Sequence, residues 1–420
     1  MTTTAPGDQQ ADRTAPLSSV PTWRTALGER AHHLSAYLVF LILVGAAIPW
    51  RSDTYFTGAI DPVVVTKAAL NVVALILAYA VTVDRSRRPL VIYPWVFLSL
   101  YLVCTLLGAY AAGNLIASGI LAVRVVMLAV AISLLARHFD GYALLQAAVG
   151  ALATFALVGG VTGLADSGER LAGGMPPLHP NELAKMCAIV VIWQLVKVTH
   201  GRDAWLDLAI IALGAAAVVA TGSRTALGVL GLTAVVTVLY TTRVRWRTVG
   251  IALMALPLGV WVIGGTDALS SLLERDDGSD ITTLSNRTIA WQSALAPKDS
   301  AWLEWLGGGL SVKQVEVSGQ WWTRQILDSS WVSALVQGGI LGLALCAAWM
   351  LYALARAATA PGHLRGLQLA LLLYLTVSGL LESGLFDSST AFIIFFTALM
   401  ATAVPRATAS VDRAAEPPSG

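Results

Sequence analysis

The sequence predicts an all-α fold, a polytopic bundle of about twelve transmembrane helices with a large, partly helical extracytoplasmic loop. Of its 420 residues, 56% are hydrophobic and only 12% are charged, whereas about a quarter of the residues in a soluble domain are charged. The apolar residues form unbroken runs such as 38–48 and 208–220, which the alternating strands of transmembrane β-barrels do not contain. This composition excludes a soluble fold, a secreted disulfide scaffold and a nucleic-acid-binding protein.

We expect a membrane-spanning helix wherever about 20 mainly apolar residues lie between charges, glycine or proline. In chain order these runs are residues 35–50, 62–83, 89–111, 115–136, 142–164, 182–199, 205–221, 224–240, 248–265, 329–355, 366–386 and 388–404. They form one transmembrane domain, residues 35–404, which lies between a disordered cytoplasmic tail at residues 1–34 and a second cytoplasmic tail at residues 405–420.

The basic residues predict the orientation of these spans. Cytoplasmic segments carry an excess of Lys and Arg, and with the amino terminus inside, the expected cytoplasmic segments hold about twice as many as the outer ones. We therefore expect a multi-pass protein of the cytoplasmic (inner) membrane with both termini in the cytoplasm. In this orientation residues 266–328 form a long loop on the outer side of the membrane, and a loop of this length indicates a function. Within it we expect helices at 268–275 and from a Ser285 or Asn286 cap to Ala296.

The first candidate site is the outer loop ERLAGGMPPLHPNELAK, residues 169–185. Pro180 and an Asn181 cap are expected to begin the sixth span, so that its amides and partial positive charge face outward. Arg170, His179 and Lys185 lie beside them, and this combination suits an anion. The alternative is an ordinary capped helix with a lysine that extends to the membrane interface.

Two further outer arginines also indicate an anionic partner. Arg224, in the turn TGSRTALG, begins the eighth span on the side where the positive-inside rule disfavours cations. Arg287, in SNRTIAWQSAL, lies in the first turn of an expected loop helix, where a cation is unfavourable unless an anion binds there. The alternatives are an arginine that contacts lipid headgroups and a solvated loop arginine.

Three other side chains are candidates with clear structural alternatives. Asp328 directly precedes the tenth span and either faces the outer cavity or caps that helix. Arg124 lies within the fourth span, where a charge marks a substrate contact or a buried ion pair; its possible partners are Asp61, Glu182 and Glu382. Trp291 is one of five loop tryptophans, which either stack on sugar rings or anchor the loop at the lipid interface.

Four motifs in order, GERLAGGMPPLHPNELA, TGSRTALG, SNRTIAWQSAL with WLGGGL, and DSSWVSALVQGGILGLAL, resemble the O-antigen ligase and O-antigen polymerase superfamily over roughly residues 115–345. The resemblance implies an integral-membrane glycosyltransferase that moves a glycan from a polyprenyl (undecaprenyl) pyrophosphate carrier to an acceptor, without nucleotide sugar, metal or other cofactor. Arg224 and Arg287 match the arginines that bind the pyrophosphate in the family, and Arg170 with the Pro180–Asn181 turn matches a third motif.

One position departs from the family pattern. Ligases carry a histidine just before the span that begins here near Ser329, whereas this chain carries Asp328. The difference favours a polymerase of cell-envelope polysaccharide, or a ligase with another acceptor. We expect an inverting transfer on the outer face of the membrane, with Asp328 as general base and His179 as the alternative base.

Two other classes of protein remain as alternatives. A lipid-linked oligosaccharide flippase or a secondary transporter fits twelve spans with both ends inside, but the sequence shows no inverted repeat and places nearly all unusual polar residues on one face. A lipid II polymerase of the shape, elongation and division family would use the same type of donor. The GSRT turn, residues 222–225, does not match that family.

Overall fold

The computed structural model describes residues 23–50, 61–83, 88–166, 170–201, 205–240, 287–298, 300–317 and 323–402. Its long helices are α1 (Trp23–Ala47), α2 (Pro62–Thr82), α3 (Tyr93–Ala111), α4 (Leu115–Ala136), α5 (Gly141–Gly163), α6 (Pro180–Thr199), α7 (Trp205–Ala220), α8 (Arg224–Tyr240), α13 (Ser330–Ala358), α14 (Gly362–Leu381) and α15 (Thr390–Thr402). Each expected span within the described residues overlaps one of these helices. The boundary of the first is wrong: α1 begins at Trp23, so residues 23–34 are helical and do not belong to a disordered tail. The span expected at 248–265 lies outside the described residues, as do the helix expected at 268–275 and the cap at Ser285 or Asn286.

The length and composition of the helices are those of a multi-pass membrane protein. Six of the described helices are long and apolar enough to cross a membrane, and four shorter helices are also apolar. The six lie in α2, α3, α4, α5, α13 and α14. The all-α polytopic bundle is therefore confirmed, and the count of about twelve spans stays a prediction.

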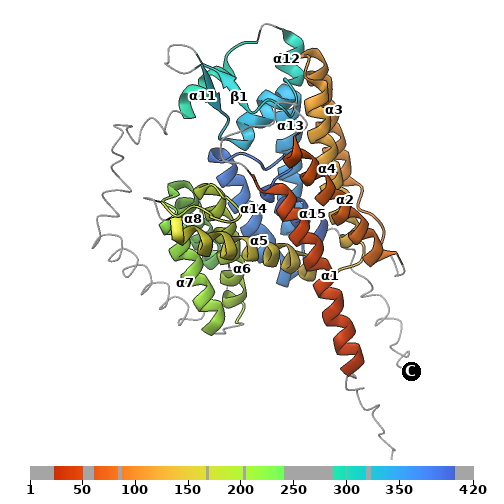
Figure 1. The fold of residues 1–420 in the computed structure, drawn as a ribbon, viewed down its shortest axis with the longest axis vertical. Coiled ribbons are helices and arrows are strands. Elements are labelled where there is room, and N and C mark those ends of the chain that lie inside the picture. The colour runs from red at the N-terminus through yellow and green to blue at the C-terminus, as the bar shows by residue number, and fades with distance from the viewer. Residues whose placement is uncertain are drawn as a thin grey trace, which may run out of the picture.

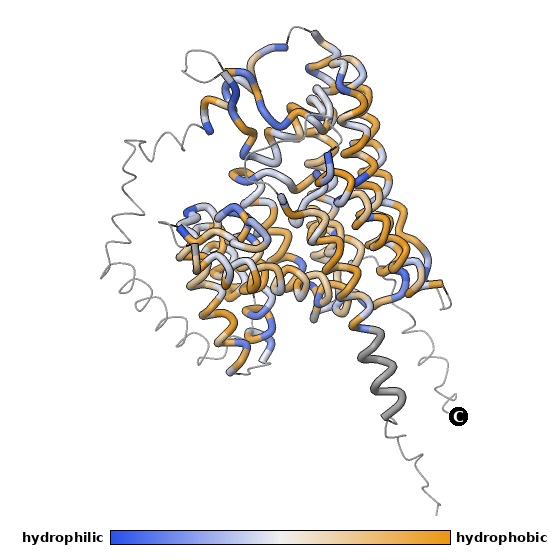
Figure 2. Tube along the Cα trace, in the orientation of Figure 1, coloured by the Kyte–Doolittle hydropathy of each residue, from blue (hydrophilic) through white to orange (hydrophobic). Residues whose placement is uncertain are grey.

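The helices form two groups joined by α14. In Figure 1, α6, α7 and α8 lie on one side of the molecule and α1 to α4 on the other. Helix α14 packs against α6 and α8 as well as against α13 and α15. The core beside it is aromatic: the fully buried Trp349 on α13 packs edge-on against Phe395 at 5.0 Å between ring centroids. Figure 2 shows hydrophobic residues along these helices and hydrophilic ones gathered where α11 and β1 lie.

The described part of the expected outer loop forms a cap at one end of the bundle (Figure 1). It holds α11 (Arg287–Leu295), α12 (Ala301–Leu306) and a short antiparallel hairpin of β1 (Gln314–Glu316) and β2 (Arg324–Ile326). The second loop helix was expected, and α11 confirms it over the residues that are described. The hairpin was not expected, because strands of three residues are too short to show an alternating pattern.

A break in α13 fixes this cap to the membrane helices. Gly339 has φ +66° and ψ −166° inside the helix, a backbone conformation that glycine adopts without steric cost. The break frees carbonyl groups, and the glycine loop after α12 binds them: the amide of Gly308 donates to Val336 O at 2.8 Å and that of Gly309 to Gln337 O at 2.9 Å. The motifs WLGGGL and QGGILG therefore form one joint.

Candidate active site

Arg287 is the centre of a polar cluster that joins four segments distant in sequence. Its Nη1 donates a hydrogen bond to Thr225 Oγ1 at 3.5 Å, in the first turn of α8. Its Nε lies 3.7 Å from Asp328 Oδ2, and its Nη2 lies 3.6 Å from Glu382 Oε1 at the end of α14. We call these four residues the Arg287 cluster. The side chain of Arg287 is only 15% exposed, so its charge acts in a partly desolvated environment.

Asp328 does not cap α13, contrary to one of the two roles expected for it. The N-cap is Ser329, whose side chain accepts a hydrogen bond from the amide of Val332 at 3.3 Å. Asp328 instead points to Arg287, and its side chain is 38% exposed. Partial burial raises the pKa of Asp328, and the positive charges of Arg287 and His179 oppose this rise. A raised pKa makes this carboxylate a better proton acceptor than one in water.

Glu382 is a member of the cluster that sequence reasoning missed. It was considered only as a partner for Arg124, because its place at the end of an apolar span showed no link to Arg287. Its backbone carbonyl accepts hydrogen bonds from the amide and the hydroxyl of Ser330, at 3.0 and 2.7 Å, which fixes it beside the start of α13. Its Oε1 is buried without a hydrogen bond. Burial raises the pKa of Glu382 to about 7, against the opposing charges of Lys185 and Arg287.

Arg170 attaches its loop to the turn between α7 and α8. Its Nε donates to Thr221 O at 2.8 Å and its Nη2 to Asn181 Oδ1 at 3.3 Å. The next residue, Leu171, donates its amide to Ala220 O at 2.9 Å. Arg170 therefore brings the loop before α6 to the GSRT turn, so the structure joins two of the predicted motifs through this arginine.

The expected Asn181 cap of α6 is wrong, because the N-cap is His179. Its Nδ1 accepts a hydrogen bond from the amide of Asn181 at 3.3 Å. The reason is local: a residue before proline favours extended backbone, and proline is well suited to the first helical position. Pro180 thus moves the boundary to His179, which has φ −59° and ψ 142°. The imidazole is exposed, and the positive charge of Arg170 and the negative charge of Asp328 act on it electrostatically.

Lys185 is buried and paired and does not extend to an interface. Its Nζ lies 2.9 Å from Glu182 Oε2, and Lys185 is 5% exposed. The other oxygen of Glu182 accepts a hydrogen bond from Thr390 at the start of α15. Lys185 also acts electrostatically on Glu382. This pair therefore lies beside the Arg287 cluster as a second, more deeply buried layer.

Arg224 is exposed, and within the described part of the chain its side chain has no ion-pair partner. It directly precedes Thr225, which Arg287 contacts. Ser223 directly precedes α8, and its Oγ accepts a hydrogen bond from the amide of Ala226 at 3.4 Å. The structure thus brings Arg224 next to the cluster through its neighbour in the turn, with its own side chain exposed.

Arg124 and Trp291 lie outside the Arg287 cluster. Arg124 donates its Nη2 to Ala46 O at 3.2 Å, and the carboxylate that acts on it is Asp387; none of the three partners expected for it is the one found. The helix packing that brings the loop before α15 to α4 has no signal in the sequence. Trp291 packs on α11 against a small core with Val315 and Leu327, which accounts for its position without a sugar. Its stacking role stays a prediction.

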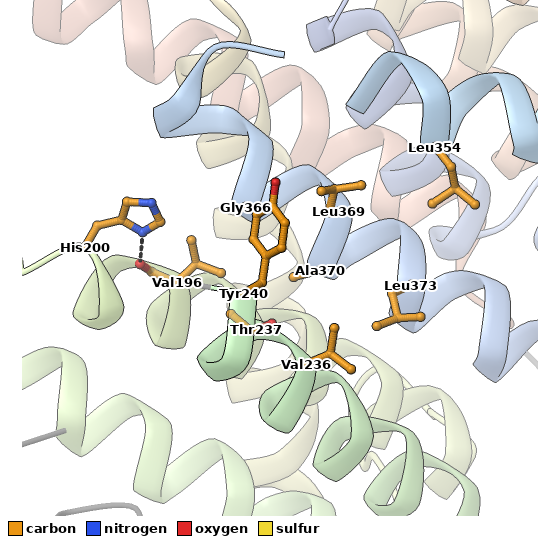
Figure 3. Close-up of a pocket in the computed structure, with 10 residues that line it drawn as sticks. All are labelled: Val196, His200, Val236, Thr237, Tyr240, Leu354, Gly366, Leu369, Ala370 and Leu373. Atoms are coloured by element: carbon orange, nitrogen blue, oxygen red, sulfur yellow. Dashed lines mark hydrogen bonds between the residues drawn. The ribbon is translucent and has the colours of Figure 1, made fainter. Parts of the chain in front are cut away.

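An apolar pocket of about 210 Å³ lies at the other end of the helices, away from this site. Figure 3 shows it between α6, α8, α13 and α14. His200 follows the last residue of α6, and Tyr240 ends α8, whereas Thr225 of the Arg287 cluster lies in the first turn of α8. The pocket contains none of the residues predicted for the site. Within the described residues, no group of three or more His, Cys, Asp and Glu side chains is placed to hold a metal ion.

The fold and this site define a polytopic helical membrane protein with an arginine and carboxylate cluster at one end of its bundle. Within that class, residues 209–347 match the family model described as O-antigen ligase, and the match supports the O-antigen ligase and polymerase superfamily that the motifs predicted. The matched segment holds Arg224, Arg287 and Asp328; Arg170, His179 and Glu382 lie outside it. A comparison with curated proteins finds no match.

Proposed function

We propose that this protein is a membrane glycosyltransferase that transfers or polymerises a glycan linked to polyprenyl pyrophosphate, on the outer face of the cytoplasmic membrane. The family match supports an enzyme of this type. The observation that carries the proposal is the hydrogen bond from Arg287 to Thr225. It joins the loop helix to the GSRT turn and thereby brings two arginine motifs to one place.

The proposed reaction is an inverting displacement. A hydroxyl of the acceptor sugar attacks the anomeric carbon of the donor glycan, the glycosidic bond to phosphate breaks, and polyprenyl pyrophosphate leaves with the bonding electrons. Negative charge grows on the phosphate oxygens as this bond breaks. Arg287 and Arg224 stabilise this negative charge, because a guanidinium group stays charged and can donate two parallel hydrogen bonds to phosphate oxygens. Arg170, Asn181 and Lys185 support the donor-binding surface.

Asp328 is the proposed general base. It lies beside Arg287 and retains exposure to an incoming hydroxyl, and its raised pKa suits proton transfer. It accepts the proton of the acceptor hydroxyl as the new glycosidic bond forms. His179, exposed at the start of α6, is the alternative base.

The identity of the residue that precedes α13 favours a polymerase over a ligase. Asp328 stands where ligases of the family carry histidine, and in this structure it is left available because Ser329 caps the helix. A ligase-like transfer of a finished glycan to a lipid or protein acceptor is the alternative within the family.

A flippase or secondary transporter is the alternative from another class. Transporters place substrates at the ends of broken helices near the bilayer midplane, and α13 is broken at Gly339. The amides of Gly308 and Gly309 donate hydrogen bonds to backbone carbonyls at that break. The protein's own backbone therefore takes the place that a substrate would take in a transporter.

The deciding experiment uses the purified protein in liposomes with a polyprenyl pyrophosphate oligosaccharide. Glycosyl transfer predicts release of polyprenyl pyrophosphate together with a longer glycan, both of which depend on Arg287. Movement of the intact lipid-linked oligosaccharide across the bilayer, without cleavage of the glycosyl bond, would instead establish a flippase. A single addition to an added acceptor, without further extension, would identify a ligase.

A further inference from the structure

The short helix α12 in the cap carries two exposed tryptophans. Trp302 and Trp305 are 48% and 50% exposed, and residues three apart on a helix are neighbours on its surface. Glu304, which lies between them in sequence, falls on another side of the helix and is also exposed. The helix therefore has an aromatic face and a charged face.

The aromatic face adjoins the last turn of α3. The Nε1 of Trp302 donates a hydrogen bond to Leu107 O at 3.3 Å. The backbone at the end of α12, Leu306 and Gly307, packs so closely on Gly108 that a Cβ there would have no room. Figure 1 shows α12 at this end of α3. Because α3, Tyr93–Ala111, is long and apolar enough to cross a membrane, the tryptophans lie level with one end of a candidate span.

A row of exposed side chains on α3 leads up to the tryptophans. Its members are three or four residues apart and between 43% and 72% exposed: Val96, Leu100, Val103, Leu107 and Tyr110. This spacing places them on one face of the helix. A continuous exposed apolar face on a helix of a membrane protein contacts acyl chains. The row ends at Tyr110, so the lipid-facing surface of α3 ends where α12 crosses it.

We infer that Trp302 and Trp305 form an interfacial anchor, which binds the headgroup region of the bilayer on the side of the membrane that holds the cap. Tryptophan and tyrosine favour this region because their rings are apolar and carry one polar group. Trp302 satisfies its N–H within the protein, which leaves the apolar part of its ring for the lipid. A bilayer is favoured over a glycan as the partner because the row on α3 continues directly into the anchor.

The anchor is joined to the break in α13. Trp305 is followed by Leu306 and by the glycine loop, where Gly308 and Gly309 donate their amides to carbonyls of α13. The cap is thus attached twice, to the helical bundle through the glycine loop and to the bilayer through α12. Neither attachment requires glycosyl transfer, and the anchor would be the same in a flippase. Failure of the anchor and failure of the proposed reaction are therefore separate results.

Spin labels on the full-length protein in liposomes test the anchor. The background variant is Cys104→Ala, because Cys187 and Cys346 are buried and Cys104 is the native cysteine that is partly exposed. Trp305→Cys places a label on the aromatic face, and Glu304→Cys is the matched control on the same helix. The label's collisions are measured with oxygen, which concentrates among lipid chains, and with a water-soluble nickel complex, which the bilayer excludes.

The label at Trp305→Cys should collide more with oxygen than with the nickel complex, and the label at Glu304→Cys should show the reverse. Val103→Cys, from the exposed row on α3, supplies the reference for a label among lipid chains. Trp302→Cys repeats the measurement at the second tryptophan, and Trp305→Cys decides alone if that variant does not fold.

Equal access of the nickel complex to the labels at Trp305→Cys and Glu304→Cys would overturn the anchor. A last arm adds the soluble oligosaccharide of the donor. If the nickel complex reached the label at Trp305→Cys in liposomes and the oligosaccharide then excluded it, the tryptophans would form a sugar-binding surface. The assignment to lipid would then be wrong.

Discussion

Arg287 Nη1 donates a hydrogen bond to Thr225 Oγ1 at 3.5 Å, across 62 residues of sequence. This contact joins α11, in the polar cap, to the first turn of α8, in the helical bundle. Asp328 and Glu382 lie on other sides of the same guanidinium. Each proposed role of the surrounding residues therefore depends on the position of Arg287.

Arg287→Ala should lower the rate of glycan transfer by at least about 100-fold, the usual effect of removing one preorganised group that stabilises transition-state charge. Arg287→Lys should recover only part of the rate, because it keeps the charge and loses the planar fork. The measurement is release of polyprenyl pyrophosphate by the reconstituted protein. Arg324→Ala, an exposed arginine on β2 in the same cap, is the control. Wild-type polymer length in the Arg287→Ala variant would contradict the proposed role of Arg287 in stabilising the leaving pyrophosphate.

Arg224→Ala should weaken donor binding and leave the fold intact. Its side chain is exposed, and truncation of an exposed side chain usually changes the free energy of unfolding by less than about 0.5 kcal/mol. Donor affinity is measured by titration with a polyprenyl pyrophosphate oligosaccharide, and stability by thermal melting in the same detergent. A variant with unchanged affinity would show that Arg224 contacts lipid headgroups or solvent only.

Asp328→Asn tests the general base. The amide cannot accept the proton of the acceptor hydroxyl, so turnover should fall by about 100-fold or more while donor affinity stays close to the wild type. Melting should change little, because Ser329 and not Asp328 caps α13. Unchanged turnover would remove Asp328 from the mechanism. A loss in His179→Ala and not in Asp328→Asn would assign the base to the histidine.

Glu382 should make stability depend on pH. Its pKa rises from an ordinary value of 4.5 to about 7 in the folded protein, so between these values the folded state keeps a proton that the unfolded chain has released. The free energy of unfolding therefore falls as pH rises through this window. Glu382→Gln should remove this decline, seen as a smaller drop in melting temperature from pH 5 to pH 8. Glu304→Gln, exposed on α12, should keep the wild-type decline; an equal decline in Glu382→Gln would contradict the assignment.

Gly339→Ala should disrupt the joint between α13 and the cap. A Cβ at this position would lie 2.2 Å from the carbonyl carbon of Trp305, on backbone with φ +66°, so the chain must shift. Gly342→Ala is the matched control one turn away, where a Cβ would meet Ala334 O at 3.4 Å. Thermal melting should fall sharply in Gly339→Ala and little in Gly342→Ala. Similar melting of the two variants would show that the break carries no constraint.

The sequence predicted elements well where local chemistry decides them. Apolar runs of bilayer length gave every long helix in the described residues, because backbone hydrogen bonds must be satisfied within each segment in a membrane. Boundaries were less accurate: Pro180 moved the cap of α6 from Asn181 to His179, and Ser329 replaced Asp328 as the cap of α13. These errors concern one or two positions, since neighbouring polar residues compete for the same cap.

The sequence by itself determined the fold class, the family motifs and the candidate arginines, because composition, helix length and the placement of charges are local properties of the chain. Only the tertiary structure decided which charges meet. Glu382 joined Arg287, while Arg124 donated a hydrogen bond to Ala46 O at the end of α1 and lay apart from the candidate site. Contacts of this kind depend on how helices distant in sequence pack, and apolar helix surfaces of similar composition carry little local information about their partners.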